Sequence, residues 1–176
     1  YYRFVMNIIV LQHIKIEDPG FIKDLMLADN VNLTTIELDE GEKIPNDLTK
    51  FDGMFCMGGP MDTYMEKEHP WLVDEKKKIK EFVVELKKPY LGFCLGCQLL
   101  GEVVGGKVVQ SKPPEIGIMD INFSKEKEND ILFSSFPEKI KSLQWHSYEV
   151  NGLDNNKDVT ILASSPVTKY QIFKYQ

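Results

Sequence analysis

Short β-rich runs alternate with segments of helical spacing in the first half of the chain, and this alternation limits the folds open to it. The runs are apolar and bounded by Gly, Pro, Asp or Lys, as buried strands are. They cover residues 5–11, 33–38, 53–57 and 90–93. Strand, helix and strand in succession build a parallel sheet wound by right-handed crossovers. The chain is therefore predicted to be an α/β protein with a mostly parallel central sheet flanked by helices.

The predicted helices cover residues 19–28 and 71–86. Apolar side chains recur on one side of each at helical spacing. They are Phe21, Leu25 and Ala28 in the first helix, and Leu72, Ile79, Phe82, Val83 and Leu86 in the second.

The pattern changes after Gly105 and Gly106 to shorter runs that leave little room for helices. These runs cover residues 107–110, 116–123, 140–146, 159–163 and 170–175. They predict extra strands and active-site loops in the C-terminal half. A chain of 176 residues with 43% hydrophobic residues can bury one core, so we predict a single domain, 1–176.

A Gly-x-Cys-x-Gly segment at residues 92–96 joins the fourth predicted strand to an apolar helical stretch. This is the pattern of a nucleophile elbow with sulfur in place of oxygen. The turn is crowded, so Gly92 and Gly96 fit positions where backbone passes close by. The positive end of the following helix dipole is expected to lower the pKa of the Cys94 thiol from about 8.5. We predict Cys94 as the nucleophile.

The other two cysteines fit structural positions. Cys56 lies in the middle of a predicted strand, and Cys97 is expected to point into helix–sheet packing. Cys94 and Cys97 also have the spacing of a thioredoxin-like redox pair, but the flanking glycines and Gln98 fit an elbow instead. Three cysteines cannot all pair within one chain, which favours a reducing cytoplasm as the location.

A second loop can complete an acyl-transfer site. Such a site needs backbone N–H donors for the developing oxyanion, one from the residue after the nucleophile and one from a neighbouring strand end. Gly58 and Gly59 follow the third predicted strand, and glycines let an amide come close to a ligand. This loop is therefore the candidate second half of the site.

Four segments in this order resemble class I glutamine amidotransferases. They are residues 58–60 (Gly-Gly-Pro), 92–98 (Gly-Phe-Cys-Leu-Gly-Cys-Gln), 115–117 (Glu-Ile-Gly) and 145–147 (Trp-His-Ser). The resemblance spans residues 6–176 and is greatest to the free-standing branch similar to the glutaminase domain of GMP synthetase. It implies a flavodoxin-like sheet and hydrolysis of the glutamine side-chain amide through a γ-glutamyl thioester, with release of ammonia.

The resemblance also implies roles for particular residues. Cys94 matches the nucleophile, and the backbone N–H groups of Gly59 and Leu95 match the oxyanion donors. Gly58 and Gln98 match substrate-holding positions. The pair Ser147 and Tyr148 matches the loop whose backbone holds the α-carboxylate and amino end of the substrate.

The catalytic base is the missing part of this pattern. A cysteine nucleophile needs a histidine oriented by a carboxylate, and the chain offers only His13, His69 and His146. His13 and His69 are expected at solvent-exposed loop positions. His146 with Glu149 would be a pair, but the family resemblance places His146 on the substrate loop.

In the family, the catalytic pair comes from a later His-Pro-Glu motif. We therefore expect that the chain is truncated before a C-terminal His-x-Glu motif and that, as given, it has little activity. A degenerate relative that binds without turnover is the alternative. Residues 1–5 are expected to be either an extension of the first strand or residues added in cloning.

Composition narrows the partners. A net charge of −6 and the lack of a Lys/Arg stripe argue against nucleic acid, and no apolar run approaches the ~20 residues of a membrane span. No ligand spacing indicates a metal, and we expect no cofactor. The expected partners are glutamine or a γ-glutamyl compound and an ammonia-accepting synthase. The alternatives are a γ-glutamyl peptide hydrolase and a non-catalytic binding or regulatory module.

Overall fold

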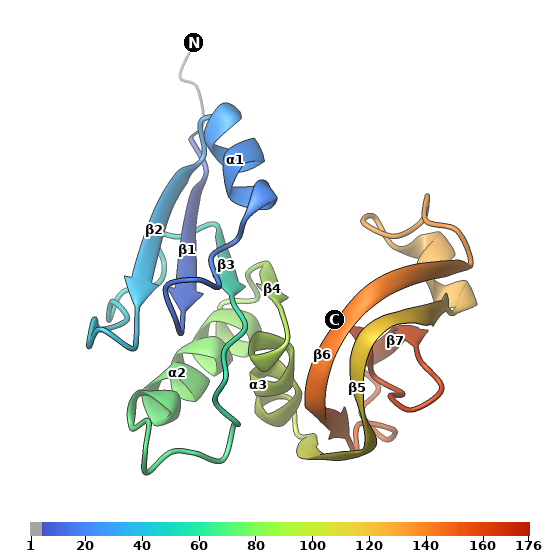
Figure 1. Cartoon of the computed structure of the whole chain (residues 1–176). Helices are drawn as coiled ribbons and strands as arrows, with labels where there is room; N and C mark the ends of the chain where they lie inside the picture. The colour runs from blue at the N-terminus through green and yellow to red at the C-terminus, as the bar shows by residue number, and fades with distance from the viewer. Residues whose placement is uncertain (1–4) are drawn as a thin grey trace. The chain divides into compact units, whose positions relative to one another are not determined.

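The computed structural model describes residues 5–176 and divides into two compact units (Figure 1). The first unit ends at Val103 and the second is Val104–Gln176. Residues 1–4 of the predicted N-terminal extension lie outside the described residues. Val5 and Met6 precede the first strand and are exposed, so the strand does not extend to them.

The first unit is a four-stranded parallel sheet with helices, as predicted. Its elements are β1 (Asn7–Gln12), α1 (Phe21–Ala28), β2 (Asn32–Glu37), β3 (Gly53–Cys56), α2 (Trp71–Lys80), the π-helical turn η1 (Glu81–Glu85), β4 (Tyr90–Gly92) and α3 (Leu95–Val103). The strand order is β2-β1-β3-β4, and every neighbouring pair is parallel. The predicted helix 71–86 is therefore α-helical only as far as Lys80.

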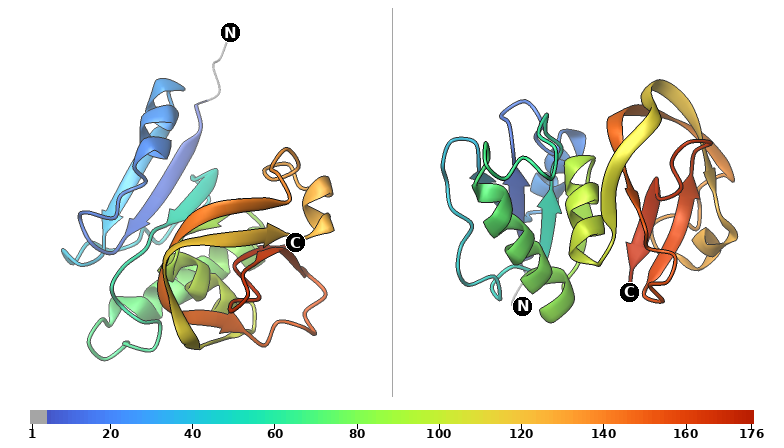
Figure 2. Two further views of the ribbon diagram at one scale, coloured as in Figure 1. Left: turned by 45° about the vertical axis from the view of Figure 1, so that its right-hand side comes forward. Right: turned by 90° about the horizontal axis from the view of Figure 1, so that it is seen from below.

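The helices cover both faces of this sheet. The crossover from β1 to β2 runs toward one edge of the sheet, and the crossover from β3 to β4 runs toward the opposite edge. Right-handed crossovers then put α1 and α2 on opposite faces, which the right-hand view of Figure 2 shows. α3 packs against α2. Ile9, Val10 and Leu11 of β1 are fully buried, as a strand between two helical layers requires.

Within residues 5–176, nothing buries the apolar side predicted for the first helix. Phe21 is 74% exposed and Leu25 is 51% exposed, and α1 has no buried residue. Instead Met26 packs against the cluster formed by Ile8, Val10 and Met57. The predicted helix is therefore correct, whereas the side that contacts the core is the one carrying Met26.

The second unit is an antiparallel sheet of its own. Its elements are β5 (Lys107–Phe123), the short 3₁₀ helix η2 (Lys125–Asn129), β6 (Lys139–Asn151), β7 (Val159–Ser164) and β8 (Ile172–Tyr175). The strand order is β6-β5-β7-β8. The predicted extra strands are therefore present but form a curled second sheet and do not lengthen the parallel one. Two predicted runs, 107–110 and 116–123, belong to the single strand β5, whose register shifts between Gln110 and Glu115.

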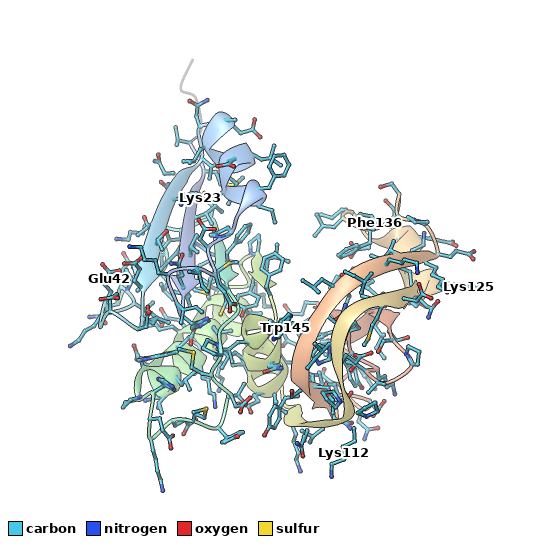
Figure 3. The ribbon with its side chains drawn as sticks, viewed as in Figure 1. Lys23, Glu42, Lys112, Lys125, Phe136 and Trp145 are labelled. Carbon is cyan, nitrogen blue, oxygen red and sulfur yellow. The ribbon has the colours of Figure 1, made fainter. Side chains whose placement is uncertain are left out.

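One face of the β5–β6 ribbon is apolar and exposed. Ile116 is paired with Trp145 and Ile118 with Leu143, and all four side chains are more than half exposed. Trp145 is labelled in Figure 3.

No helix within residues 5–176 has the length and apolar character needed to cross a bilayer.

Asp130 anchors the turn that follows η2. One of its oxygens, Oδ1, accepts hydrogen bonds from the N–H groups of Leu132 (2.9 Å) and Phe133 (3.3 Å), and Oδ2 lies 3.2 Å from Nζ of Lys174 in β8. Burial opposes ionisation, but these N–H groups and Lys174 outweigh it and lower the pKa of Asp130.

We predict that Asp130→Asn destabilises the protein at neutral pH and that the difference from wild type shrinks in acid. A lowered pKa contributes stability above the unfolded-state value of about 4, and this contribution is lost as the pH falls through the folded-state pKa. Urea unfolding followed by circular dichroism at several pH values measures it. Asp158→Asn, at an exposed position in the same unit, is the control. A pH-independent difference would contradict the prediction.

Candidate active site

The predicted site residues of the first unit gather at one edge of the parallel sheet. β1, β3 and β4 run in the same direction, so their carboxyl ends lie together. His13 follows β1, the Gly58-Gly59 loop follows β3, and Cys94 follows β4. This edge is where open α/β sheets bind ligands.

Cys94 has the strained backbone of a nucleophile elbow. Its φ angle is 50°, in the left-handed region that a non-glycine residue rarely adopts. α3 starts at the next residue, and the Cys94 side chain is exposed. The sharp turn thus projects the sulfur from the sheet edge.

The flanking glycines are explained by close backbone packing. A Cβ on Gly96 would lie 2.2 Å from the carbonyl oxygen of Cys56, and a Cβ on Gly92 would lie 2.6 Å from the backbone of Gly96. Real side chains do not tolerate such distances to backbone atoms, which cannot rotate away. The first turn of α3 can therefore press against the end of β3 only because both positions are glycine.

We predict that Gly96→Ala destabilises the protein by about 3 kcal/mol, at the upper end of what overpacking costs. Gly41→Ala is the matched control, since Gly41 has a positive φ but no atom within 4 Å of the added Cβ. It should cost about 1 kcal/mol through backbone strain alone. Urea unfolding of the two variants compares them. Equal losses would show that the contact with Cys56 is unimportant.

Two backbone N–H groups act on the Cys94 sulfur. They belong to Leu95 and Gly59, the two residues that the family resemblance assigns as oxyanion donors, and both lower the pKa of the thiol. The donors come from separate elements, one from the first turn of α3 and one from the loop after β3. The sulfur and the two donors thus face one another in the resting protein.

The expected lowering of the Cys94 pKa is wrong. Although the residue is exposed, the atoms packed around its thiol displace water, and this desolvation and the negative charge of Glu17 raise its pKa. The N–H groups of Leu95 and Gly59 lower it by less. Glu17 was missed in the sequence. Its Oε2 atom lies 2.2 Å from where a Cβ of Gly58 would be, so the carboxylate occupies the space that this glycine leaves free.

The remaining thiols are less acidic still. Burial and the neighbouring Cys94 raise the pKa of Cys97 to about 12. Burial and the charge of Glu75 raise the pKa of Cys56 well above its usual value. All three cysteines are free.

We predict that iodoacetamide labels Cys94 before Cys56 and Cys97, with a rate that still rises above pH 9 because the pKa of Cys94 is raised. Glu17→Gln removes a nearby negative charge and should lower this pKa. Labelling near pH 8 should then accelerate about threefold, because a larger share of the thiol is ionised at that pH. Mass mapping of labelled peptides gives the rates. Glu40→Gln makes the same charge change at an exposed position and is the control; an equal effect there would remove Glu17 from the explanation.

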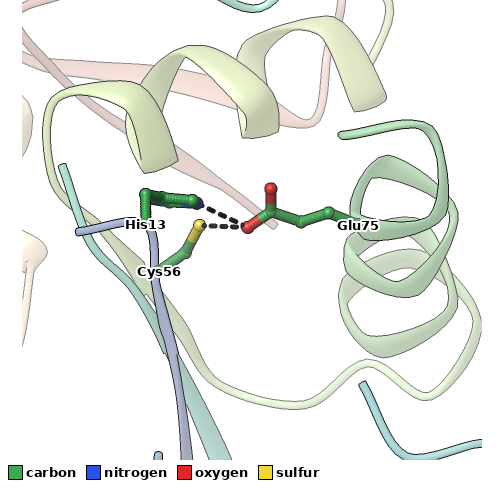
Figure 4. A group of neighbouring side chains, drawn as sticks. All are labelled: His13, Cys56 and Glu75. Carbon is green, nitrogen blue, oxygen red and sulfur yellow. Dashed lines mark hydrogen bonds and ion pairs between the residues drawn. The ribbon is translucent and has the colours of Figure 1, made fainter. Parts of the chain in front are cut away.

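His13 is fully buried, so the expectation of an exposed loop histidine is wrong. Its Nδ1 atom lies 2.9 Å from the carbonyl oxygen of Gly58, and its Nε2 atom lies 2.8 Å from Oε1 of Glu75 in α2. Cys56 donates its S–H to the same oxygen at 3.3 Å. Figure 4 shows His13 and Cys56 pointing at the Glu75 carboxylate. Burial alone would lower the pKa of His13, but the hydrogen bond and charge of Glu75 raise it.

This buried cluster has the donor types of a metal site, with ligand atoms of His13, Cys56 and Glu75 within 4.8 Å of one another. The geometry favours a hydrogen-bonded network. The imidazole and the thiol already share one carboxylate oxygen, and the high pKa of Cys56 disfavours the thiolate that a metal requires.

His69 is half-buried beside Trp71, with ring centroids 5.4 Å apart.

The other predicted site residues divide between the units. Gln98 is buried in α3 and its backbone N–H bonds to the Cys94 carbonyl (3.1 Å). Ser147 and Tyr148 lie within strand β6 of the second unit and not on a loop. His146 bonds through Nδ1 to the Tyr148 carbonyl (3.0 Å), and its Nε2 lies 3.2 Å from Glu115 Oε2. Its carboxylate neighbour is therefore Glu115, where the sequence had suggested Glu149.

A strained cysteine at the carboxyl edge of a parallel sheet, facing two backbone donors, is a cysteine nucleophile elbow. The model of the family "Glutamine amidotransferase class-I" matches residues 22–173, which include parts of both units. The chain belongs to the class I glutamine amidotransferase family.

Two individual proteins to which the chain is similar are consistent with this family assignment. The chain is 32% identical over 130 residues to a glutamine-hydrolysing GMP synthase component of Sulfolobus acidocaldarius, covering 74% of this chain and 63% of that protein. It is 31% identical to "Gamma-glutamyl peptidase 3" of Arabidopsis thaliana over 134 residues, covering 73% of this chain and 51% of that protein.

The crystal structure of a glutamine amidotransferase from Thermotoga maritima superimposes with a TM-score of 0.88 at 26% identity, covering 98% of this chain and 73% of that one. Its fold confirms the α/β arrangement of parallel and curled antiparallel sheets. The chain spans about half to two thirds of the length of the curated relatives it matches.

Proposed function

We propose that the protein is a glutaminase-type amidotransferase in which Cys94 attacks the γ-amide carbon of glutamine. The observation that carries this proposal is the left-handed turn that projects Cys94 from the carboxyl edge of the sheet, beside the N–H groups of Gly59 and Leu95 that act on its sulfur. A carbonyl carbon bonded to that sulfur would place its oxygen beside the same donors. Stabilising that oxygen as it becomes negative is the main electrostatic task in acyl transfer.

The chemistry then follows from the elbow. The sulfur adds to the amide carbon and the carbonyl electron pair moves to oxygen. Collapse of this intermediate expels ammonia, once its nitrogen is protonated, and leaves a γ-glutamyl thioester on Cys94. Water hydrolyses the thioester to glutamate. Gly58 and Gln98 near the nucleophile are proposed to hold the substrate, and the substrate-binding assignment of Ser147 and Tyr148 also stays a proposal.

A raised thiol pKa makes a base necessary, and two of the three histidines, His13 and His146, have other partners. Both ring nitrogens of His13 are occupied by Gly58 and Glu75, and His146 is bound by Tyr148 beside Glu115. We therefore propose that neither His13 nor His146 is the base that serves Cys94.

The relatives suggest two substrate classes. One is named as part of a glutamine-hydrolysing GMP synthase, which supports free glutamine as substrate and a synthase partner that accepts the ammonia. The other is named a γ-glutamyl peptidase, which supports a γ-glutamyl peptide cleaved by the same thioester chemistry. The strand order β2-β1-β3-β4 supports a flavodoxin-like assignment for the first sheet. Free thiols support a reducing, cytoplasmic location.

We predict that Cys94→Ser reduces ammonia release from glutamine by at least about a thousandfold, since loss of the nucleophile removes the covalent route. The whole chain is incubated with glutamine or with a γ-glutamyl dipeptide, and ammonia and free amino acids are measured. Cys97→Ser is the matched control, a neighbouring thiol in α3 that the mechanism does not use.

Intact-protein mass spectrometry extends the test to slow turnover. A γ-glutamyl adduct on the wild type and on Cys97→Ser, but not on Cys94→Ser, would support the thioester. The substrate that forms the adduct faster identifies the substrate class. Ammonia release that survives in Cys94→Ser, or a glutamine-bound protein with no adduct and no turnover, would contradict the proposed function.

A further inference from the structure

The buried histidine lies on the far side of the peptide group that supplies one oxyanion donor. The carbonyl of Gly58 and the N–H of Gly59 belong to the same planar peptide, in which they point in opposite directions. His13 contacts the carbonyl end at 2.9 Å. The N–H end acts on the Cys94 sulfur and lowers the pKa of this thiol. Rotation of this peptide would therefore break both contacts at once.

The direction of the His13 hydrogen bond is fixed by chemistry. A carbonyl oxygen only accepts, so Nδ1 of His13 carries the proton and donates it to Gly58. On the other side of the ring, Glu75 holds Nε2 at 2.8 Å. The carboxylate also accepts the S–H of Cys56, which comes from the last residue of β3, immediately before the loop.

Packing keeps the ring in this orientation. The side chains of His13 and Glu75 are both fully buried, and the ring of Trp71 stacks on the imidazole with centroids 5.5 Å apart and planes 21° apart. A Cβ on Gly59 would lie 2.9 Å from Cβ of His13, so the loop rests directly on this residue. A peptide flanked by two glycines would otherwise rotate easily.

We propose that His13, oriented by Glu75, is a positioning residue that holds the Gly58–Gly59 peptide with its N–H directed at the oxyanion formed on Cys94. The inference rests on the proposed function, because it assigns His13 to the oxyanion site of that reaction. His13 does not touch the substrate, and it exchanges no proton with the thiol. Its contribution is the direction of one backbone donor.

Two reagents separate this role from a merely structural one. 4-Nitrophenyl acetate acylates the sulfur: the S–C bond forms, the carbonyl electrons move to oxygen, and collapse expels 4-nitrophenolate. Iodoacetamide alkylates the sulfur at a saturated carbon, where iodide leaves and no oxyanion forms. The thiol proton passes to solvent in both reactions. The ratio of the acylation rate to the alkylation rate at Cys94 therefore measures how well the oxyanion donors stabilise the intermediate. Changes in the acidity or exposure of the thiol affect both rates and cancel in the ratio.

Two substitutions of His13 introduce the same amide group on side chains of different length. In His13→Asn the side-chain nitrogen takes the place of Nδ1, so the donor to Gly58 is kept. In His13→Gln the nitrogen lies one bond further out, toward Glu75, and that donor is lost. We expect the acylation-to-alkylation ratio to fall about tenfold or more in His13→Gln. Complete loss of one oxyanion donor slows acyl transfer by about a hundredfold, and a misdirected donor should lose part of that effect. His13→Asn should retain it to within about threefold on the same scale.

The experiment uses the whole chain, with Cys94→Ser subtracted as background and His69→Gln as a control that alters the other histidine beside Trp71. Circular dichroism and the iodoacetamide rate report folding. An unchanged ratio in folded His13→Gln, or an equal fall in both variants, would overturn the proposal. If either variant does not fold, nitrogen NMR of the unmodified protein near neutral pH decides, because a His13 Nδ1 without a proton would overturn it as well. Neither readout requires glutamine turnover, so failure of the proposed substrate is seen separately.

Discussion

The close approach between the first turn of α3 and the end of β3 is the contact on which the site depends. Gly96 lies against the Cys56 carbonyl, and its own carbonyl accepts a hydrogen bond from the Tyr90 hydroxyl (2.7 Å). The helix can start this near the sheet only if Cys94 takes its left-handed backbone conformation. The strain at Cys94 is thus offset by packing among residues that do no chemistry, and the sulfur faces the loop after β3 as a result.

A network of buried polar groups supports the same loop from behind. Three elements of the first unit contribute to it, since His13 follows β1, Cys56 ends β3 and Glu75 reaches in from α2. Buried ionisable groups are costly unless they are paired. Here the pairing ends on the Gly58 carbonyl, so the cluster links the interior of the sheet to the loop that supplies a backbone donor.

Sequence patterns predicted the parallel sheet and the elbow, because each depends on local chemistry: apolar runs, glycine spacing and a helix start. The oxyanion role of Gly59 and Leu95 came from the family resemblance and stays a prediction. They missed what depends on three-dimensional neighbours. His13 was assigned to solvent because it follows a strand, yet Glu75 offered a signal. It occupies the apolar stripe of α2 between Leu72 and Ile79, where a carboxylate requires a buried partner. The Cys94 pKa was misjudged for the same reason, since Glu17 is far away in sequence and close in space.

The raised pKa of Cys94 changes how the elbow is understood. A site that stored a thiolate would hold its two N–H groups in strong bonds to a negatively charged sulfur, and these bonds would have to break when the substrate arrived. In this protein the donors lower the thiol pKa less than burial and Glu17 raise it, so the resting sulfur is mainly protonated. On the proposed mechanism, the same N–H groups interact with a neutral thiol in the resting protein and with a full negative charge once the oxyanion has formed. Because only interactions that strengthen in the transition state speed the chemical step, this balance favours acyl transfer over a permanently reactive thiol.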